Sequence, residues 1–390
     1  MKKVLIASYE NPFTRFAGDE IYTCNLLQAF HDLGWAVSFL YYDSNEFAPL
    51  LPKEEADRMA RSEAVPFRPA SKLDLILSLQ PGMIVNRRRA DYTARFEAWL
   101  REDSYDLVVL NHQKMTFLAV DCKIQPPVLY FSHNAEYLLS KNTFLQFPQG
   151  LQKWLYGQDA LKTRWFERKM LRKVQAVTAI CEHDERYFKE QGRSTAVLRP
   201  VLTAPAHVVD NLHNSQRLEI LIVGSFTWGP KAQNVLQFLE AYHKHRLAEE
   251  GMPLWVVGKM SDRIKAIVEQ RYPSVKATGR VDDLEEYYDR CAIAVVPEVL
   301  GGGFKLKVAE AALRGKAIFA VKGAITECNF KSGVHFHESV SFDELANDIL
   351  HSRARLNYIR ALGKNALRLS QTEYSQRSFN DQLERHINTL

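Results

Sequence analysis

Short apolar runs alternate with helical stretches in the first half of the chain. Residues 4–8 form a mainly apolar run, which is typical of a parallel strand buried on both faces. Apolar residues between 21 and 33 then fall on one face of a helix, which Gly34 ends. This alternation predicts a parallel sheet with helices on both faces. Further strand-like runs lie at 36–41, 107–110, 128–131 and 176–180.

The pattern starts again in the second half. Residues 202–216 are rich in Pro, Ala, His and Asn and have no hydrophobic period, which is typical of a linker. We therefore predict an α/β protein of two Rossmann-like, doubly wound parallel-sheet domains that face a central cleft, where ligands meet the carboxyl ends of the strands. The predicted divisions are a first domain at 1–203, a linker at 204–217 and a second domain at 218–373. Strand-like runs in the second half lie at 218–223, 254–257, 293–296 and 317–321, with a helix over 234–245.

Composition narrows the classes of function. The 390 residues include 51 Lys and Arg against 46 Asp and Glu, so the net charge of +5 is spread thinly, and we expect no nucleic-acid partner. No apolar run approaches the roughly 18–20 residues of a membrane span, and the apolar start is too short for a signal peptide. The five cysteines lie far apart and form no Cys-x-x-Cys pair, which indicates neither a zinc site nor a disulfide framework. We expect a reduced, cytoplasmic protein.

A glycine-rich turn between a predicted strand and a predicted helix is the first candidate site. Three glycines, Gly301 to Gly303, allow a ligand to approach the backbone, and the helix that follows offers free N–H groups to an anion. Lys305 and Lys307 add mobile cations near that helix end, and Glu310 is placed to accept hydrogen bonds from sugar hydroxyls. This combination suggests a seat for a nucleotide sugar. The alternative is a tight turn followed by a solvated helix face.

The same stretch carries a family resemblance. The run GGGFKLKVAEAA at 301–312 resembles the donor-site signature of glycosyltransferase family 4, which has the GT-B fold. The run IVGSFTWGPK at 222–231 resembles the first strand and loop of the donor domain in that family. Residues 131–137, FSHNAEY, resemble its His-Asn-x-Glu segment on the acceptor side, and residues 167–182 resemble the helix and strand that close the acceptor domain. The resemblance covers nearly the whole chain and implies that residues 374–390 cross back to the first domain.

The resemblance also implies roles for single residues. Lys231 matches the lysine that holds the donor diphosphate, and Lys305 would compensate for Ser225, which stands where the family often has an arginine. Glu310 matches the second glutamate of a pair, whereas Gly302 stands in place of the first. The implied catalytic residues are Lys231, Lys305 and Glu310. The implied donor-binding residues are Gly224, Ser225, Lys231, Gly302, Gly303, Phe304, Lys305 and Glu310.

The acceptor-side candidates follow strands of the first domain. His133 comes directly after an apolar strand, where a neutral imidazole can bind a sugar hydroxyl; the alternative is a structural histidine at the strand end. Asn134 stands beside it. Gly18 and Asp19 lie in the first strand–helix loop, where Gly18 lets the loop bend towards the cleft, and Asp19 is also a candidate helix cap.

We expect neither a metal nor a cofactor. The chain lacks an Asp-x-Asp motif, which fits activation of the donor by lysine and the helix dipole. Two His-x-His pairs, His243/His245 and His335/His337, are candidates for metal ligands. The first pair lies in a helical pattern that points the two rings apart, and the second has no apparent third ligand, so we interpret neither as a metal site.

The stretch 153–173 is basic and aromatic. It holds seven Lys or Arg against two Asp or Glu, with tryptophan, tyrosine and phenylalanine interleaved. Such a helix can lie on an anionic membrane from the cytoplasmic side. The alternative is a surface helix whose aromatic side chains pack on the sheet.

The function predicted is transfer of a sugar from a nucleotide diphosphate sugar to the hydroxyl of a glycan or lipid-linked glycan, in polysaccharide biosynthesis. The resemblance implies a hexosyltransferase-like enzyme that retains the anomeric configuration. Two alternatives remain open at this point, a sugar-nucleotide 2-epimerase and a non-catalytic sugar-binding subunit of the same fold. The Lys-rich loop argues against the epimerase, whereas Ser225 and Gly302 keep the second alternative open.

Overall fold

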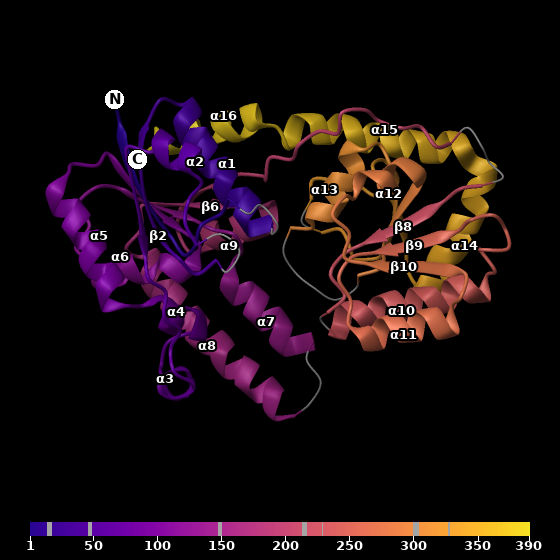
Figure 1. Cartoon of the computed structure of the whole chain (residues 1–390), viewed down its shortest axis with the longest axis horizontal. Helices are drawn as coiled ribbons and strands as arrows, with labels where there is room; N and C mark the ends of the chain where they lie inside the picture. The colour runs from indigo at the N-terminus through magenta and orange to yellow at the C-terminus, as the bar shows by residue number, and fades with distance from the viewer. Residues whose placement is uncertain are drawn as a thin grey trace. The chain divides into compact units, whose positions relative to one another are not determined.

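The computed structural model describes residues 1–13, 18–45, 49–146, 150–212, 217–227, 229–298, 304–326 and 328–390. The chain divides into two compact units (Figure 1). The first unit comprises Met1–Val201 together with Ser375–Leu390, and the second comprises Leu202–Tyr374.

The first unit is built on a seven-stranded sheet with the order β3-β2-β1-β4-β5-β6-β7. Every paired strand is parallel to its neighbour, and each crossover returns through a helix. The central strands are buried and mainly apolar because helices cover both faces. The strands are β1 (Lys3–Ser8), β2 (Ala36–Tyr42), β3 (Arg61–Val65), β4 (Leu107–Asn111), β5 (Val128–Phe131), β6 (Ala176–Ala179) and β7 (Ser194–Val197).

The helices of this unit form two layers and one hairpin. Figure 1 shows α1 and α16 on one side of the sheet and α5 and α6 on the other. Helices α7 and α8 pack side by side, and Gly157 permits this because a Cβ there would lie 3.0 Å from the Phe144 ring. The helices are α1 (Gly18–Asp32), α2 (Lys53–Arg58), α3 (Lys72–Leu77), α4 (Gly82–Arg87), α5 (Ala90–Glu102), η1 (Gln113–Met115), α6 (Phe117–Asp121), α7 (Glu136–Gln146), α8 (Leu151–Leu171), α9 (Glu182–Glu190) and α16 (Gln376–Ile387).

The last helix of the chain, α16, belongs to the first unit. The Phe379 ring is buried and lies 6.0 Å from the ring of Tyr22 on α1. Nε2 of His386 hydrogen-bonds the carbonyl oxygen of Val177 on β6 at 2.9 Å. The chain therefore leaves the first unit at Val201 and returns to it at Ser375.

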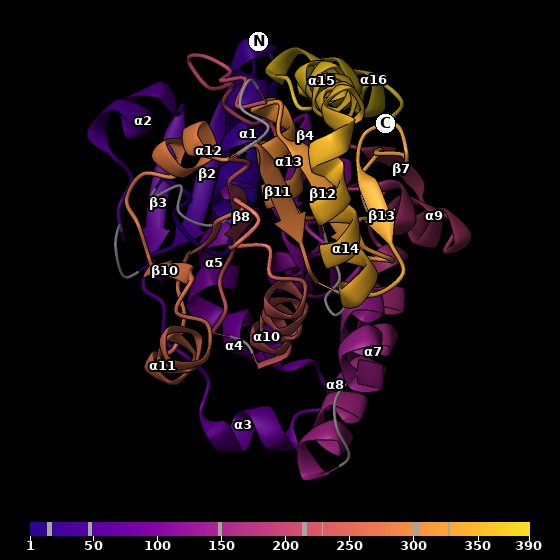
Figure 2. The same ribbon diagram turned by 90° about the vertical axis from the view of Figure 1, so that its right-hand side faces the viewer.

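The second unit contains a six-stranded parallel sheet with the order β10-β9-β8-β11-β12-β13. Figure 2 shows β11, β12 and β13 side by side, and in Figure 1 helices α10 and α11 lie below the sheet. The strands are β8 (Ile220–Val223), β9 (Leu254–Val257), β10 (Val275–Gly279), β11 (Ile293–Val296), β12 (Ala317–Val321) and β13 (His337–Ser339). The helices are α10 (Gly229–Lys244), α11 (Asp262–Arg271), α12 (Glu285–Arg290), α13 (Leu306–Leu313), α14 (Phe342–Ser352), η2 (Arg353–Arg355) and α15 (Leu356–Glu373).

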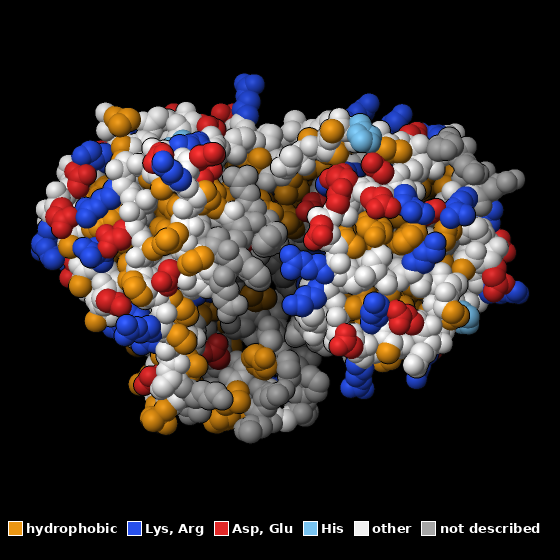
Figure 3. All heavy atoms as spheres, in the orientation of Figure 1, with side chains coloured by type: hydrophobic (Ala, Val, Ile, Leu, Met, Phe, Trp, Pro, Cys, Tyr) orange, Lys and Arg blue, Asp and Glu red, His pale blue; other side chains and the backbone are white. Residues whose placement is uncertain are grey.

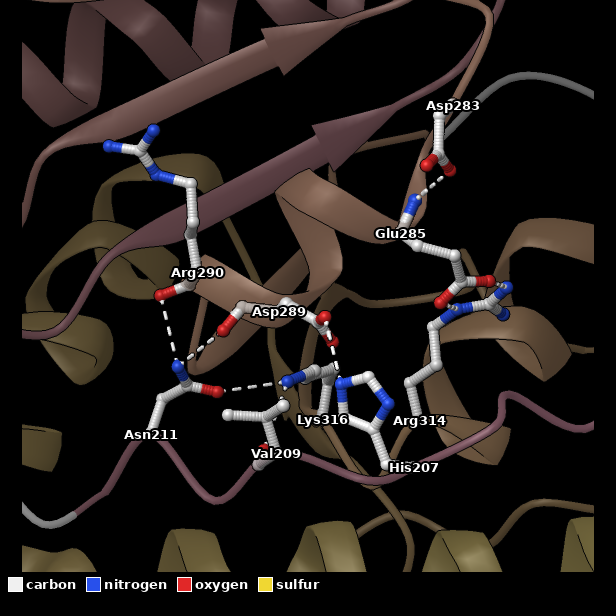
Figure 4. A network of polar contacts seen from close by, with 9 residues as sticks. All are labelled: His207, Val209, Asn211, Asp283, Glu285, Asp289, Arg290, Arg314 and Lys316. Carbon is white, nitrogen blue, oxygen red and sulfur yellow. Dashed lines mark hydrogen bonds and ion pairs between the residues drawn. The ribbon is translucent and has the colours of Figure 1, made fainter.

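The segment before β8 is held on the second unit by polar contacts (Figure 4). The buried Lys316 donates from Nζ to the Val209 carbonyl at 3.2 Å and to Oδ1 of Asn211 at 3.0 Å. Nδ2 of Asn211 donates in turn to the Asp289 carbonyl at 2.6 Å. Leu212 is part of the apolar core of this unit.

The predicted fold class is confirmed, because two sheets contain only parallel pairs among the described residues and helices flank both. The apolar interior of each unit explains this arrangement, since a strand buried on both faces needs a helix above and below it. In the described part of the chain, no helix is long and apolar enough to cross a membrane.

Candidate functional site

Two glycines bring strands β8 and β9 together at the carboxyl edge of the second sheet. Gly258 follows β9 with φ +133°, and a Cβ there would lie 1.9 Å from the Gly224 carbonyl oxygen. Gly224 follows β8, and its own missing Cβ would lie 3.2 Å from the Phe226 ring and 3.6 Å from Nζ of Lys307. A Cβ at position 258 would overlap the backbone of residue 224, so that position requires glycine.

A buried ion pair lies at the same edge. Glu298 follows β11 and is 3% exposed, and its carboxylate pairs with the ammonium of Lys307 in the first turn of α13. Burial lowers the pKa of Lys307, and Glu298 opposes that shift. Lys307 is therefore fixed in the fold, which corrects the expectation of a mobile cation: burial and the ion pair hold it in place.

The charges of two further lysines also act on Glu298. Burial would raise the pKa of this carboxyl, but nearby positive charge holds it below its ordinary value. That charge comes from Lys307, Lys231 and Lys305. Lys231 lies in the first turn of α10, and Lys305 is the residue that precedes α13. Because helix N-termini also attract anions, this group, here called the lysine cluster (Lys231, Lys305, Lys307 and Glu298), suits a diphosphate.

Glu310 lies farther along α13 in a second group of charges. Burial raises its pKa, Arg314 lowers it and Glu285 raises it. Arg314 donates from Nε to Oε2 of Glu285 at 3.0 Å, as Figure 4 shows, and from Nη1 to the Glu310 carbonyl at 3.0 Å. Within the described residues, no hydrogen bond engages the Glu310 carboxylate, which leaves it free to accept one from a ligand hydroxyl.

The donor-side residues expected from the sequence lie in different places. The charges of Lys231 and Lys305 act on Glu298, while Glu310 belongs to the group with Glu285 and Arg314. Exposed Ser225 has Oγ 3.2 Å from Oγ1 of Thr227, and the Phe304 ring lies 5.6 Å from that of Tyr374. Residues 299–303, which include Gly302 and Gly303, lie outside the described residues. Sequence reasoning missed Glu298, although its place directly after a strand and Pro297 was a signal.

The first unit carries its own cluster at the carboxyl ends of β1, β4 and β5. His133 is 5% exposed, and its Nε2 lies 2.8 Å from Oδ1 of Asn111. Burial lowers the pKa of His133 to about 3, so the imidazole is neutral. Its Nδ1 has no partner among the described residues. Asn134 follows it and accepts a hydrogen bond at its carbonyl from Ser132 Oγ at 2.7 Å.

Gly18 and Asp19 begin α1 near the same edge. The Asp19 carboxylate accepts a hydrogen bond from the Tyr9 hydroxyl and also contacts the N–H of Glu20 at 3.2 Å. Asp19 thus lies inside the first turn, and its carboxylate orients a buried tyrosine. Gly18 is exposed.

Sequence reasoning missed His112 in this cluster, and it included Glu136 only as part of the segment 131–137. His112 has the unusual φ of +71°, and its Nε2 lies 3.7 Å from Oε1 of Glu136. Burial raises the pKa of Glu136 to about 7, and burial also holds the pKa of His112 well below its ordinary value. Strained backbone of this kind is common at functional sites. The signal was again position, because His112 directly follows β4.

The four histidines of the two His-x-His pairs lie on separate elements. His243 lies within α10 and His245 just beyond it, whereas His335 lies in a turn and His337 on β13. His337 contacts Oδ2 of Asp348 at 3.0 Å through Nε2. Among the described residues, no group of three or more His, Cys, Asp or Glu side chains is placed to hold a metal ion.

Models of known protein families match the sequences of both units. Residues 17–202 match the family model described as "Glycosyl transferase 4-like domain", and residues 217–352 match the one described as "Glycosyl transferases group 1". No curated protein sequence matched the chain.

Solved structures share the whole fold at low sequence identity. Sucrose-phosphate synthase from Thermosynechococcus elongatus has a TM-score of 0.72 at 16% identity, over 100% of this chain and 99% of that one. Anabaena HepE, solved with UDP and glucose, has a TM-score of 0.67 at 16% identity over 100% of both chains. S. aureus TarM, solved with fondaparinux, α-GlcNAc-glycerol and UDP, has a TM-score of 0.67 at 10% identity over 100% of both chains. With a 4-like domain followed by a group 1 domain in this fold, the chain is a GT-B glycosyltransferase that resembles glycosyltransferase family 4.

Proposed function

We propose that the protein transfers a hexose from a nucleotide diphosphate sugar to a hydroxyl of a glycan or lipid-linked glycan, in polysaccharide biosynthesis. The observation that carries this proposal is the lysine cluster at the carboxyl edge of the second sheet. The ammonium groups of Lys231 and Lys305 and the N-terminus of α13 there provide the positive charge that a diphosphate leaving group requires. UDP in the structures of HepE and TarM supports a nucleotide as the ligand.

The residues divide the work of donor binding. Lys231 and Lys305 neutralise the charge that develops on the diphosphate as the sugar leaves, a stabilisation worth roughly 3 kcal/mol per well-placed donor. The partly buried carboxylate of Glu310 accepts hydrogen bonds from ribose or sugar hydroxyls. Because cationic side chains supply the charge, the proposed reaction needs no metal and no cofactor. The resemblance to family 4 supports retention of the anomeric configuration.

The acceptor lies with the first unit in this proposal. Neutral His133 has one ring nitrogen held by Asn111 and a second without a partner in the described part of the chain. A neutral imidazole fixed in this way can bind a sugar hydroxyl as donor or acceptor. Gly18, Asp19 and Asn134 complete the acceptor-side set.

A screen of sugar nucleotides tests the proposal. UDP-, GDP- and ADP-sugars are added to the protein at about a hundredfold excess over Kd, where a true donor stabilises the fold by about 2.7 kcal/mol. The stabilising donor is then incubated with glycan acceptors in excess EDTA. Transfer with an unchanged anomeric configuration supports the proposal, whereas loss of activity that Mn²⁺ restores contradicts the metal-free mechanism. A donor that changes without any acceptor would instead indicate an epimerase.

Peripheral contact with an anionic membrane is a second part of the proposal. Trp154, Leu161 and Trp165 on α8 are 59%, 67% and 61% exposed, while Phe166 and Met170 on the same helix are buried. Figure 3 shows hydrophobic side chains at the surface around α3 and α8. The exposed tryptophans and the basic residues of 153–173 favour a lipid surface, with the protein located at the cytoplasmic face.

A further inference from the structure

Glu298 reduces the positive charge of the lysine cluster. Its carboxylate is 3% exposed and pairs with Lys307, while the charges of Lys231 and Lys305 also act on it. Counted over these four groups, three ammonium ions and one carboxylate leave a net charge of two positive units. A carboxylate beside a phosphate site opposes phosphate binding, so its presence there needs a reason.

The donor and the product of the proposed reaction differ in charge. The diphosphate of a nucleotide sugar is substituted at both ends and carries about two negative charges. After transfer, the free nucleoside diphosphate has a terminal phosphate whose second ionisation lies near pH 6, so it carries about three negative charges at pH 7.5. Three uncompensated lysines would match the product better than the donor.

We propose that Glu298 determines the preference of this site for the donor over the product, because it cancels the charge of Lys307 and leaves two lysine charges for the diphosphate. The inference rests on the proposed function, since it needs the lysine cluster to bind the diphosphate. The third negative charge of the product then meets no free ammonium and lies near a carboxylate. Glu298 thereby weakens product binding and favours release.

The test measures the sign of an affinity change. Glu298→Gln keeps the shape of the side chain and its hydrogen bond to Lys307 but removes the negative charge. At pH 7.5, calorimetry should show UDP binding about tenfold tighter than in the wild type, and UDP-glucose about fivefold tighter or less, because the effect scales with ligand charge. In kinetics the variant should show lower KM, lower kcat and stronger inhibition by UDP. Unchanged or weaker UDP binding by the folded variant would overturn the proposal.

A pH series checks that charge is the cause. At pH 5.5 the terminal phosphate of UDP takes up a proton and UDP approaches the charge of UDP-glucose. At pH 5.5, Glu298→Gln should therefore raise the affinity for UDP no more than the affinity for UDP-glucose. A gain for UDP that persists unchanged at this pH would contradict the charge argument.

Two further variants serve as a control and as a substitute. Glu219→Gln is the matched control, because Glu219 is also a buried, ion-paired glutamate of the second unit but precedes β8 at the opposite edge of the sheet. Its UDP affinity should stay within about twofold of the wild type. The double variant Glu298→Gln/Lys307→Gln leaves no lone buried charge, so it can be studied even if Glu298→Gln does not fold. It keeps a net charge of two, and UDP affinity within about twofold of the wild type supports the inference, whereas a tenfold loss overturns it.

Binding measurements on the wild-type protein distinguish a failure of the proposed function from a failure of the role proposed for Glu298. Three pairs are tested: UDP with UDP-glucose, GDP with a GDP-sugar, and ADP with an ADP-sugar. If the wild-type protein binds none of them, the proposed function fails. If it binds one pair but Glu298→Gln binds that nucleoside diphosphate no more tightly, the proposed function stands and the role of Glu298 is wrong.

Discussion

Nε2 of His133 lies 2.8 Å from Oδ1 of Asn111, so the histidine at the end of β5 is held by the residue at the end of β4. Asn111 is itself fixed, because its Nδ2 donates to the hydroxyls of Ser8 at 3.0 Å and Thr23 at 3.1 Å. A chain of buried hydrogen bonds thus orients the imidazole ring. The ring is neutral and points its other nitrogen away from Asn111.

The first prediction concerns His133 itself. His133→Ala should raise KM for the acceptor and lower kcat/KM about tenfold, since one hydrogen bond of about 1 to 1.5 kcal/mol is lost. Donor affinity, measured by calorimetry, should not change. His351→Ala, at an exposed position of the second unit, is the control. Weaker donor binding in His133→Ala would contradict the assignment of His133 to the acceptor.

The second prediction concerns Lys231. Lys231→Ala removes a positive charge from the lysine cluster and should lower kcat/KM for the donor about 10²-fold or more, the scale of one lost transition-state donor. Lys265→Ala on α11, whose side chain is 45% exposed, should leave the kinetics unchanged. The assignment of Lys231 to the diphosphate would be refuted if Lys231→Ala had wild-type kinetics and an unchanged circular dichroism spectrum.

The third prediction concerns Glu310. Glu310→Gln removes the charge of a carboxylate that we expect to bind ribose or sugar hydroxyls, so donor affinity should fall about 10- to 100-fold. Pyrophosphate lacks those hydroxyls, and its affinity should barely change. Competition titrations with both ligands measure the difference. Equal weakening of both would show that Glu310 organises the loop and does not contact the hydroxyls.

The fourth prediction concerns pH and stability. Glu167 is fully buried, and burial raises its pKa to about 8 although the Tyr187 hydroxyl donates to its carboxylate. The folded state therefore holds a proton that the unfolded state loses at about pH 4.5, so stability falls as pH rises from about 4.5 to 8.

The variant Glu167→Gln removes this ionisation. It should match the wild type below pH 4.5 and be more stable by about 2 to 4 kcal/mol near pH 8, as measured by urea unfolding. The exposed Glu190→Gln is the control, with no such pH dependence of the difference. A difference between Glu167→Gln and wild type that stays constant from pH 4 to 8 would contradict the assignment.

The fifth prediction concerns the membrane. Binding to vesicles that contain phosphatidylglycerol should be strong at low salt and weak for neutral phosphatidylcholine. Reversing the charges of Lys162, Arg168, Lys169 and Arg172 should reduce it, since each basic residue contributes about 1 kcal/mol near such a surface. Replacing Trp154 and Trp165 by alanine should also weaken binding. Sedimentation with vesicles measures it, and self-association without vesicle binding would indicate a second copy as the partner.

The sequence predicts the interior of both sheets better than their edges. Central strands such as β1 and β11 are apolar on both faces, and that pattern is visible without a structure. The edge strand β3 has the sequence RSEAV and is only half buried, so it lacks a strand-like pattern. Edge strands β10 and β13 were missed for the same reason.

Some residues of the candidate site could be predicted from the sequence and others could not. Lys231, Lys305 and Glu310 were predicted because they stand next to recognisable motifs. Glu298 and His112 were missed because their roles depend on partners from other elements: Lys307 at the start of α13 and Glu136 at the start of α7. A sequence lists these side chains, but only the packed structure shows which of them lose water and share a site.

The return of the chain to the first unit at Ser375 has a consequence for synthesis on the ribosome. A protein emerges from its N-terminus, and domains usually fold in that order. Here the first unit lacks α16, with Phe379 and His386, until all of the second unit has been made. The hydrophobic surface of α1 that Phe379 covers stays open during that time. Nascent chains should therefore need chaperone protection, and a truncation before residue 375 should aggregate although it removes nothing from the donor-side unit.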